Sequence, residues 1–232
     1  MKLFSLLFLL AFGITILVSA QNDQEDFKIE IELKHTAVIS QGSTGTCWSF
    51  ATTSFLESEI LRKGFPETDL SEMYFVNFAY ENKAKMYLLY HGNNNFSQGG
   101  QAHDVFDVVR EFGIVTNESY PGIKTDGRFR HGDLVNQLNQ EITGLNKKRE
   151  DFDVREIKLI DSILNEHIGK IPIKIKTGEE NYSPVEFQKK FKINPDDYVE
   201  LTSYNHHPFY APFVLEIPDN WSHALYYNLP IN

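Results

Sequence analysis

The chain of 232 residues is long enough for one sizeable domain or two small ones, and its 41% hydrophobic and 13% aromatic content indicates a packed globular core. The formal net charge of −10 argues against nucleic acid as a partner, because phosphates repel an acidic surface, and it is typical of a soluble protein. A single cysteine excludes any disulfide within the chain.

The first twenty residues have the pattern of a secretory signal peptide. Lys2 gives a positive start, residues 3–18 are almost entirely apolar, and Val18-Ser19-Ala20 offers small residues for cleavage. An uncleaved membrane anchor is the alternative, but the run is short for a membrane span and no basic flank follows it. We therefore expect residues 1–20 to be removed from a secreted or periplasmic protein, which would contact a membrane only through the uncleaved signal.

The next stretch, residues 27–33, alternates apolar and charged side chains in the order Phe-Lys-Ile-Glu-Ile-Glu-Leu. This period of two predicts a strand or an extended arm with one buried face.

The most informative stretch of the sequence runs from Gln41 to Ala51 and reads Gln-Gly-Ser-Thr-Gly-Thr-Cys-Trp-Ser-Phe-Ala. An apolar run that begins at Cys47 and stops at Gly64 predicts a helix with a glycine at its end. A cysteine in the first helical turn lies in the positive field of the helix dipole, which favours the nucleophilic thiolate. Gln41 lies six residues earlier, so its carboxamide and the Cys47 backbone N–H could both point at a developing oxyanion.

A lone buried cysteine is more often a small hydrophobic residue in a core, and that is the alternative interpretation of Cys47. Gln41 six residues before it, Trp48 directly after it and a helix that starts at the thiol occur together. This combination favours a nucleophile.

Further elements follow in order. A second helix is expected to be capped by Asp69 or Ser71, and a third spans residues 102–112. Between them, the loop of residues 93–101 contains the pair Gly99-Gly100, which permits close approach of another backbone.

Residues 123–170 are charged, with apolar residues at helical spacing, and Ser183-Pro184 reads as another helix start. Residues 198–203 and 213–217 predict strands, with an aromatic and proline-rich loop at 204–212 between them. His206 and His207 lie in this loop, beside a proline.

The motif Gln-x5-Cys-Trp-Ser-Phe-Ala resembles the nucleophile loop of papain-like cysteine peptidases. The glycine pair after the second helix is similar to the pair that offers backbone hydrogen bonds to extended substrates in that family. The resemblance implies Cys47 as nucleophile and Gln41 as oxyanion-hole donor, and it places Gly99, Gly100 and Trp48 in the substrate-binding cleft. It implies a peptide as substrate, no cofactor and no metal ion.

Two features separate this chain from a simple papain-like domain. Thr44 stands where the family signature, Cys-Gly-[Ser/Ala]-Cys-[Trp/Tyr], begins with a cysteine, so that cysteine's disulfide cannot form here. The helical spacing of residues 123–170 is similar to a helical block found at this place in the bleomycin hydrolase and aminopeptidase C branch. Residues 183–187 resemble that branch's Thr-Pro-Leu-Glu-Phe, and residues 226–231 resemble its Leu-Tyr-Asn-Asn-x-Pro.

The resemblance therefore predicts an α+β, papain-like domain over residues 21–232. It would have a helical lobe, a helical insertion at about 123–192 and only the first strands of the second lobe. The implied activity is aminopeptidase-like proteolysis, and the branch leaves a homo-oligomer open.

The histidine base of such a site is expected at about positions 177–197, and this window contains no histidine. His223 precedes an alanine, as the family's histidine does. However, only nine residues follow it, and Asn-Ser-Trp occurs nowhere in the chain. We expect the catalytic histidine and asparagine beyond residue 232, so this chain would be an N-terminal fragment that turns over slowly or not at all.

Two alternatives remain. One is a catalytically inactive, peptide-binding pseudoenzyme or truncated product. The other is an acyltransferase of the transglutaminase type, against which the spacing of Gln41 and the pair Gly99-Gly100 argue.

Overall fold

A computed structural model of the chain describes residues 28–148 and 154–231. The chain divides into two units, residues 1–33 and 34–232, and each is considered by itself. In the described part of the first unit, residues 28–33 have no regular secondary structure, and Ile29, Ile31 and Leu33 are exposed. The predicted buried face of this stretch is therefore wrong: alternation specifies a strand only where a neighbouring strand accepts its backbone hydrogen bonds. Phe27 and the expected signal peptide lie outside the described residues.

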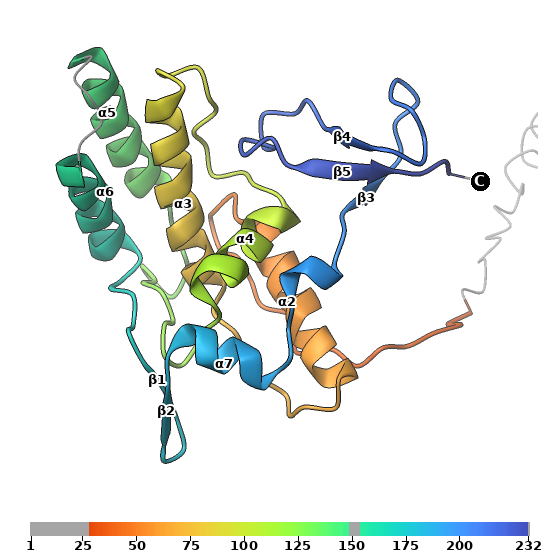
Figure 1. Cartoon of the computed structure of the whole chain (residues 1–232). Helices are drawn as coiled ribbons and strands as arrows, with labels where there is room; N and C mark the ends of the chain where they lie inside the picture. The colour runs from red at the N-terminus through yellow and green to blue at the C-terminus, as the bar shows by residue number, and fades with distance from the viewer. Residues whose placement is uncertain (1–27, 149–153, 232) are drawn as a thin grey trace, which may run out of the picture. The chain divides into compact units, whose positions relative to one another are not determined.

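Three helices form the centre of the second unit: α2 (Cys47–Arg62), α3 (Glu72–Leu89) and α4 (Ala102–Phe112), which pack against one another (Figure 1). All three helices lie where the sequence predicted them. Gly64 follows α2 with a left-handed φ of 82°, the conformation that ends many helices. The Ser71 hydroxyl caps α3 by accepting a hydrogen bond from the Tyr74 backbone N–H at 3.1 Å.

Two further helices, α5 (Gly132–Lys148) and α6 (Val154–His167), pack against each other and against α3 (Figure 1). They confirm the helical character expected of residues 123–170. A short antiparallel hairpin of β1 (Ile175–Thr177) and β2 (Glu180–Tyr182) follows, which the sequence did not predict. α7 (Pro184–Lys190) then begins at the expected place, with a capping box between Ser183 and Glu186.

The last part of the chain forms a small sheet with the order β3-β5-β4. β3 (Leu201–Thr202) and β4 (Pro212–Val214) are shorter than the strands predicted for these regions, and a 3₁₀ turn (Pro195–Asp197) precedes them. The central strand, β5 (Leu225–Asn228), was not predicted; it runs parallel to β3 and antiparallel to β4.

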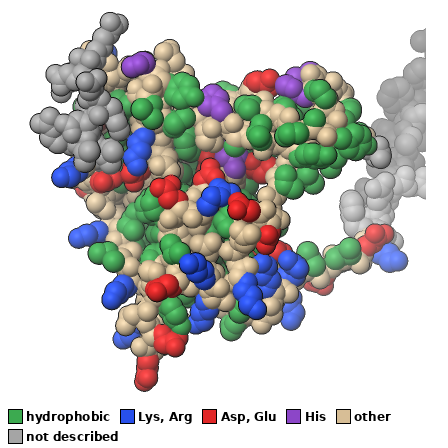
Figure 2. All heavy atoms as spheres, in the orientation of Figure 1, with side chains coloured by type: hydrophobic (Ala, Val, Ile, Leu, Met, Phe, Trp, Pro, Cys, Tyr) green, Lys and Arg blue, Asp and Glu red, His purple; other side chains and the backbone are tan. Residues whose placement is uncertain are grey.

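The buried side chains of the described residues form two clusters. The larger cluster joins α2 to α7, and the smaller one contains Phe213, Leu215 and Tyr226 in the sheet. Hydrophobic side chains also gather on the surface of the sheet region, where Leu201 and Leu225 are exposed (Figure 2). None of the helices in the described part of the chain is long and apolar enough to cross a membrane.

Candidate active site

Cys47 is the first residue of α2, and its side chain is exposed. The helix is held in this orientation by its next two residues, because Trp48 and Ser49 are buried. The Ser49 hydroxyl donates a hydrogen bond of 2.9 Å to the Glu72 carbonyl oxygen of α3. Packing of α2 against α3 therefore leaves the thiol facing outward at the positive end of the helix.

The loop before Cys47 is closed by reciprocal hydrogen bonds between Gln41 and Thr44. The Gln41 carboxamide donates to the Thr44 carbonyl oxygen, and the Thr44 hydroxyl donates to the Gln41 carbonyl oxygen at 2.9 Å. Gly42 has a left-handed φ of 66° and lies so close to the backbone of Phe129 that a Cβ would be 2.7 Å from its carbonyl oxygen. The compact loop that begins at Gln41 thus leads directly into α2 at Cys47. Among the described residues no hydrogen bond joins the carboxamide directly to Cys47.

The pair Gly99-Gly100 lies in a loop that contacts the Cys47 loop through Gln98. The Gln98 side-chain oxygen accepts a hydrogen bond of 2.7 Å from the Gly45 backbone N–H. A Cβ on Gly100 would be 2.8 Å from the Trp48 ring, and one on Gly99 would overlap the Asp219 carboxylate. A side chain at Gly100 would therefore displace the Trp48 ring, whereas one at Gly99 would displace only the end of the Asp219 side chain.

Trp48 lies beneath this loop. Only 6% of the residue is exposed, and its indole N–H donates to the Gln98 carbonyl oxygen at 2.9 Å. Any effect of Trp48 on a substrate would therefore pass through the loop that it supports.

A buried lysine of α3, which sequence reasoning missed, also binds the loop that contains Gly99 and Gly100. Lys83 of α3 is fully buried and donates to the carbonyl oxygens of Ser97, at 3.0 Å, and Gly99. Burial lowers the pKa of Lys83 to about 8, although the nearby carboxylates of Asp104 and Asp219 oppose this shift. The available signal was its helical spacing from the apolar residues of α3, since a lysine on a buried face must bind a specific partner.

Asp104, in the first turn of α4, connects this lysine to the final part of the chain. Its Oδ2 accepts hydrogen bonds from the Gln101 backbone N–H at 2.8 Å and from the Trp221 indole at 3.0 Å. Burial raises the pKa of Asp104 to about 6, against the opposing effects of His103, the Gln101 N–H, Lys83 and Trp221. A buried polar network therefore fixes the glycine loop between α3, α4 and the segment that contains Asp219 and Trp221.

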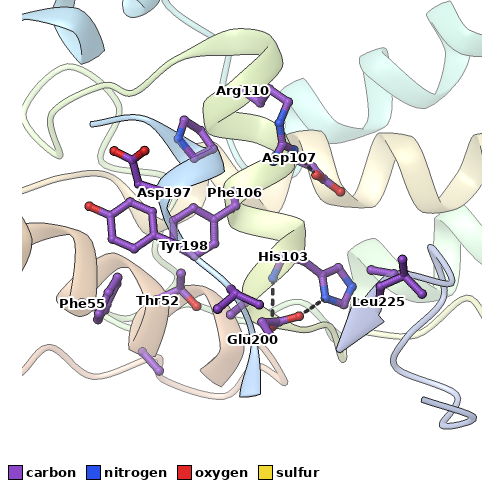
Figure 3. Close-up of a pocket in the computed structure, with 15 residues that line it drawn as sticks. Thr52, Phe55, His103, Phe106, Asp107, Arg110, Asp197, Tyr198, Glu200 and Leu225 are labelled. Carbon is purple, nitrogen blue, oxygen red and sulfur yellow. Dashed lines mark hydrogen bonds and ion pairs between the residues drawn. The ribbon is translucent and has the colours of Figure 1, made fainter. Parts of the chain in front are cut away.

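A cleft of about 630 Å³ opens beside α2 (Figure 3). Ala51, one helical turn after Cys47, is exposed on the same face of α2 and lines this cleft. His103 lies on another wall, where its backbone N–H and its ring Nδ1 are 3.1 and 2.6 Å from the two carboxylate oxygens of Glu200. Burial lowers the pKa of His103, but Glu200 and neighbouring acidic residues raise it above its ordinary value.

Figure 3 also shows the acidic side chains Asp107 and Asp197 at this cleft, together with the aromatic rings of Phe106 and Tyr198. These rings stack with a centroid distance of 5.1 Å. The cleft thus combines apolar walls with several carboxylates.

His206, His207 and His223 are not among the residues that line this cleft. His223 is exposed and stacks on Tyr90, with 5.6 Å between ring centroids. His206 and His207 face Glu216. No hydrogen bond or ion pair joins Cys47 to a histidine in residues 28–148 and 154–231.

The sequence profile described as "Papain family cysteine protease" matches residues 23–208. Curated relatives include a "Viral cathepsin" from Orgyia pseudotsugata multicapsid polyhedrosis virus, 31% identical over 63% of this chain and 40% of its own length. A "Cathepsin L-like proteinase" from Fasciola hepatica is 29% identical over 41% of this chain and 26% of its own length. The matched region thus spans less than half the length of these relatives. Among solved structures, PepW from Lactobacillus rhamnosis has a TM-score of 0.69 at 21% identity, covering 88% of this chain and 56% of that chain.

Proposed function

Because the chain belongs to the papain family of cysteine proteases, we propose that Cys47 is the nucleophile of a cysteine peptidase site and Gln41 its oxyanion donor. The α+β fold is the one that the sequence predicted for this family. The observation that carries the proposal is the position of Cys47, exposed at the N-terminus of a helix whose other faces are buried.

The chemistry follows from this position. The Cys47 thiolate attacks a peptide carbonyl carbon, a C–S bond forms, and the carbonyl oxygen becomes an oxyanion. The Cys47 backbone N–H and the Gln41 carboxamide donate hydrogen bonds to that oxygen. The C–N bond then breaks, the amine leaves with a proton from a general acid, and water hydrolyses the acyl-enzyme.

The cleft beside α2 is the proposed binding site for the peptide. Its location on the same helix face as Cys47 supports this, because Ala51 lines it one turn after Cys47. Neither Gly99 nor Gly100 is among the residues that line this cleft, and the Gly99 carbonyl oxygen is bonded to Lys83. We also propose aminopeptidase action, as in the bleomycin hydrolase branch. The carboxylates of Asp107, Asp197 and Glu200 at the cleft could receive a free α-amino group.

The imidazole that deprotonates Cys47 is proposed to come from outside the residues that the structure describes. Export is part of the same proposal, and it rests on the pattern of residues 1–20.

A second candidate function is peptide binding without catalysis. It is favoured by one observation: no histidine is bonded to Cys47 within the described residues. The two candidates differ in whether the thiol is activated.

Two reagents test the thiolate and the oxyanion hole separately. Iodoacetamide reports the thiolate, and a peptide aldehyde reports the oxyanion hole, because it forms a tetrahedral adduct with an oxyanion. We expect selective alkylation of Cys47 near neutral pH, faster than that of a free thiol such as glutathione. We expect Gln41→Ala to weaken aldehyde binding by about tenfold or more while the alkylation rate stays unchanged.

Cys47→Ser should abolish both reactions, and Gln140→Ala, at an exposed glutamine of α5, should change neither. Alkylation as slow as that of glutathione would favour the inert binding protein. Aldehyde binding that is insensitive to Gln41→Ala would remove the oxyanion role from this residue.

A further inference from the structure

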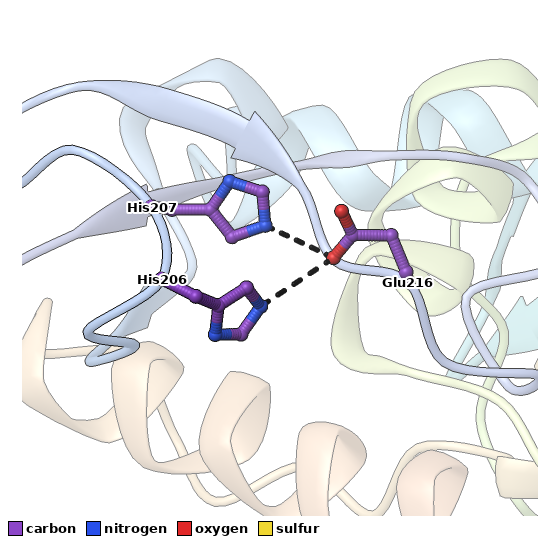
Figure 4. A group of neighbouring side chains, drawn as sticks. All are labelled: His206, His207 and Glu216. Atoms are coloured by element: carbon purple, nitrogen blue, oxygen red, sulfur yellow. Dashed lines mark hydrogen bonds and ion pairs between the residues drawn. The ribbon is translucent and has the colours of Figure 1, made fainter.

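Three side chains at the edge of the small sheet converge outside the candidate active site. His206 and His207 lie in the loop between β3 and β4, and Glu216 follows the end of β4. The Nε2 atoms of His207 and His206 are 3.0 and 3.8 Å from the same Glu216 oxygen, Oε2 (Figure 4). One ligand atom from each residue lies within 4.8 Å of the others. We propose that His206, His207 and Glu216 bind a divalent transition-metal ion of the Zn²⁺ type.

The donor set and its spacing fit such an ion. Two imidazole nitrogens and one carboxylate oxygen are ligands that Zn²⁺ prefers, at about 2.0–2.2 Å in a tetrahedral arrangement. Ligand atoms around such an ion are therefore about 3.3 Å apart. The distances from Glu216 Oε2 to the two histidines, 3.0 and 3.8 Å, lie on either side of that value. The ion would replace the contacts between histidine and glutamate, and water would take the fourth position.

The loop that carries the two histidines is held by a buried asparagine of β5. Asn228 is fully buried, and its side-chain oxygen accepts a hydrogen bond from the Tyr204 backbone N–H at 2.8 Å. Its side-chain nitrogen lies 2.9, 3.0 and 3.1 Å from the carbonyl oxygens of Tyr204, His207 and Pro208. This clamp fixes the backbone of the loop beside β5.

One ligand ring is also oriented by packing. The His207 imidazole stacks on Phe213 of β4 with a centroid distance of 4.0 Å. In this orientation its Nε2 faces Glu216 Oε2 (Figure 4). Such support from outside the ligand set is typical of metal sites, because it reduces the ordering required on binding.

The contacts between these side chains are too exposed to stabilise the sheet by themselves. The side chains of His206 and Glu216 are 61% and 63% exposed. Contacts of this kind contribute little stability in water. A bound ion would instead join the 204–208 loop to the end of β4 and stabilise a sheet that has only a small core.

The test is a Zn²⁺ titration of the full chain, without a histidine tag, in competition with a chromogenic chelator. Cys47→Ser serves as the parent, so that the thiol does not bind the ion. We expect one equivalent to bind with a dissociation constant in the micromolar range or below. His206→Ala and Glu216→Gln should each weaken it by at least about tenfold. His35→Ala and Glu118→Gln, at exposed positions elsewhere, should leave it unchanged.

Two further measurements distinguish a loss of metal binding from a folding defect in the variants. Co²⁺ in the same site should give the intense visible absorption of tetrahedral coordination, and the two ligand variants should lose it. Zn²⁺ should raise the melting temperature of the parent but not of the variants, whose melting temperatures without metal should match that of the parent. Equal zinc affinity in the parent and in the two single variants, His206→Ala and Glu216→Gln, would overturn the proposal. So would the absence of saturable binding by the parent.

Discussion

Glu72 is the first residue of α3, and only 5% of it is exposed. Burial, with smaller effects of the neighbouring Glu57 and Asp69, raises the pKa of its carboxyl group to about 7, against a hydrogen bond from its own backbone N–H. Glu57 is buried nearby, where it accepts hydrogen bonds from the Thr36 hydroxyl and the Leu70 backbone N–H. The contact between α2 and α3 thus contains carboxyl groups whose ionisation is unfavourable.

This arrangement predicts a pH dependence of stability. The folded pKa of Glu72, about 7, lies above the ordinary value of 4.5, so the folded state holds a proton that the unfolded state has released. Its contribution to stability is present below pH 4.5 and is lost as the pH rises through 7. At about 1.4 kcal/mol per pH unit, the interval from 4.5 to about 7 limits the loss to at most about 3.5 kcal/mol.

Glu72→Gln should remove this part of the fall in folding stability with rising pH. Urea unfolding between pH 5 and 8 measures it as the difference in slope between the variant and the wild type. Glu118→Gln, at an exposed position, should keep the wild-type slope. Equal slopes for wild type and Glu72→Gln would show that Glu72 ionises freely in the folded protein.

At the scale of elements, the loop with Gly99-Gly100 is held from three directions. Trp48 of α2 and Lys83 of α3 support it, and the segment of Asp219 packs against it. The Lys83 ammonium lies between the rings of Trp48, Tyr80 and Trp221, at 5.6–5.8 Å from their centroids. A mutation in α3 should therefore change a loop to which it is not adjacent in the sequence.

Lys83→Met should loosen this loop, because it removes the donor to the Ser97 and Gly99 carbonyl oxygens. A buried acceptor without a partner costs about 1–3 kcal/mol. We expect the backbone amides of Gly100 and Gln101 to exchange hydrogen at least about tenfold faster, as measured by mass spectrometry or NMR.

Lys85→Met is the matched control. Lys85 lies on the same helix, is partly exposed and pairs with Glu81. Its replacement should leave exchange in the loop unchanged. Unchanged exchange in Lys83→Met would mean that Trp48 and Asp219 hold the loop without the lysine.

At the scale of the whole described unit, the two clusters of buried side chains differ greatly in size. The helical cluster includes most of the buried apolar residues, whereas the sheet cluster consists of Phe213, Leu215 and Tyr226 with Ile217 packed against them. Burial of apolar area is the main source of stability. The sheet should therefore open more easily than the helices.

Native-state hydrogen exchange tests this expectation through the amides of Tyr227 and Asn228, which donate to Glu200 and Ala211. They should have a smaller opening free energy than amides in the middle of α3. Phe213→Ala should remove most of their protection, whereas Phe75→Ala in the main core should lower the protection of α3 and leave the sheet amides unchanged. Equal opening free energies for the sheet and α3 would instead indicate one cooperative unit.

Features that depend on neighbouring residues could be predicted before the fold was known. The helix starts at Cys47, Ser71, Ala102 and Ser183 could be predicted, because caps and apolar spacing act within a few residues. The family membership was also readable, since Gln41 and Cys47 belong to one short motif, and the sequence profile confirms it. The branch within the family and the roles of the site residues stay predictions.

Features that join distant segments became visible only in the folded chain. β5 pairs with β3 and β4, Trp48 lies under Gly100, and Lys83 reaches the Gly99 loop. The exposure of Ile29 and its neighbours has the same origin, because a strand needs a partner that local alternation cannot supply. Cysteine and glutamine are placed by one loop, but their surroundings depend on contacts between residues tens of positions apart, and no local pattern encodes those contacts.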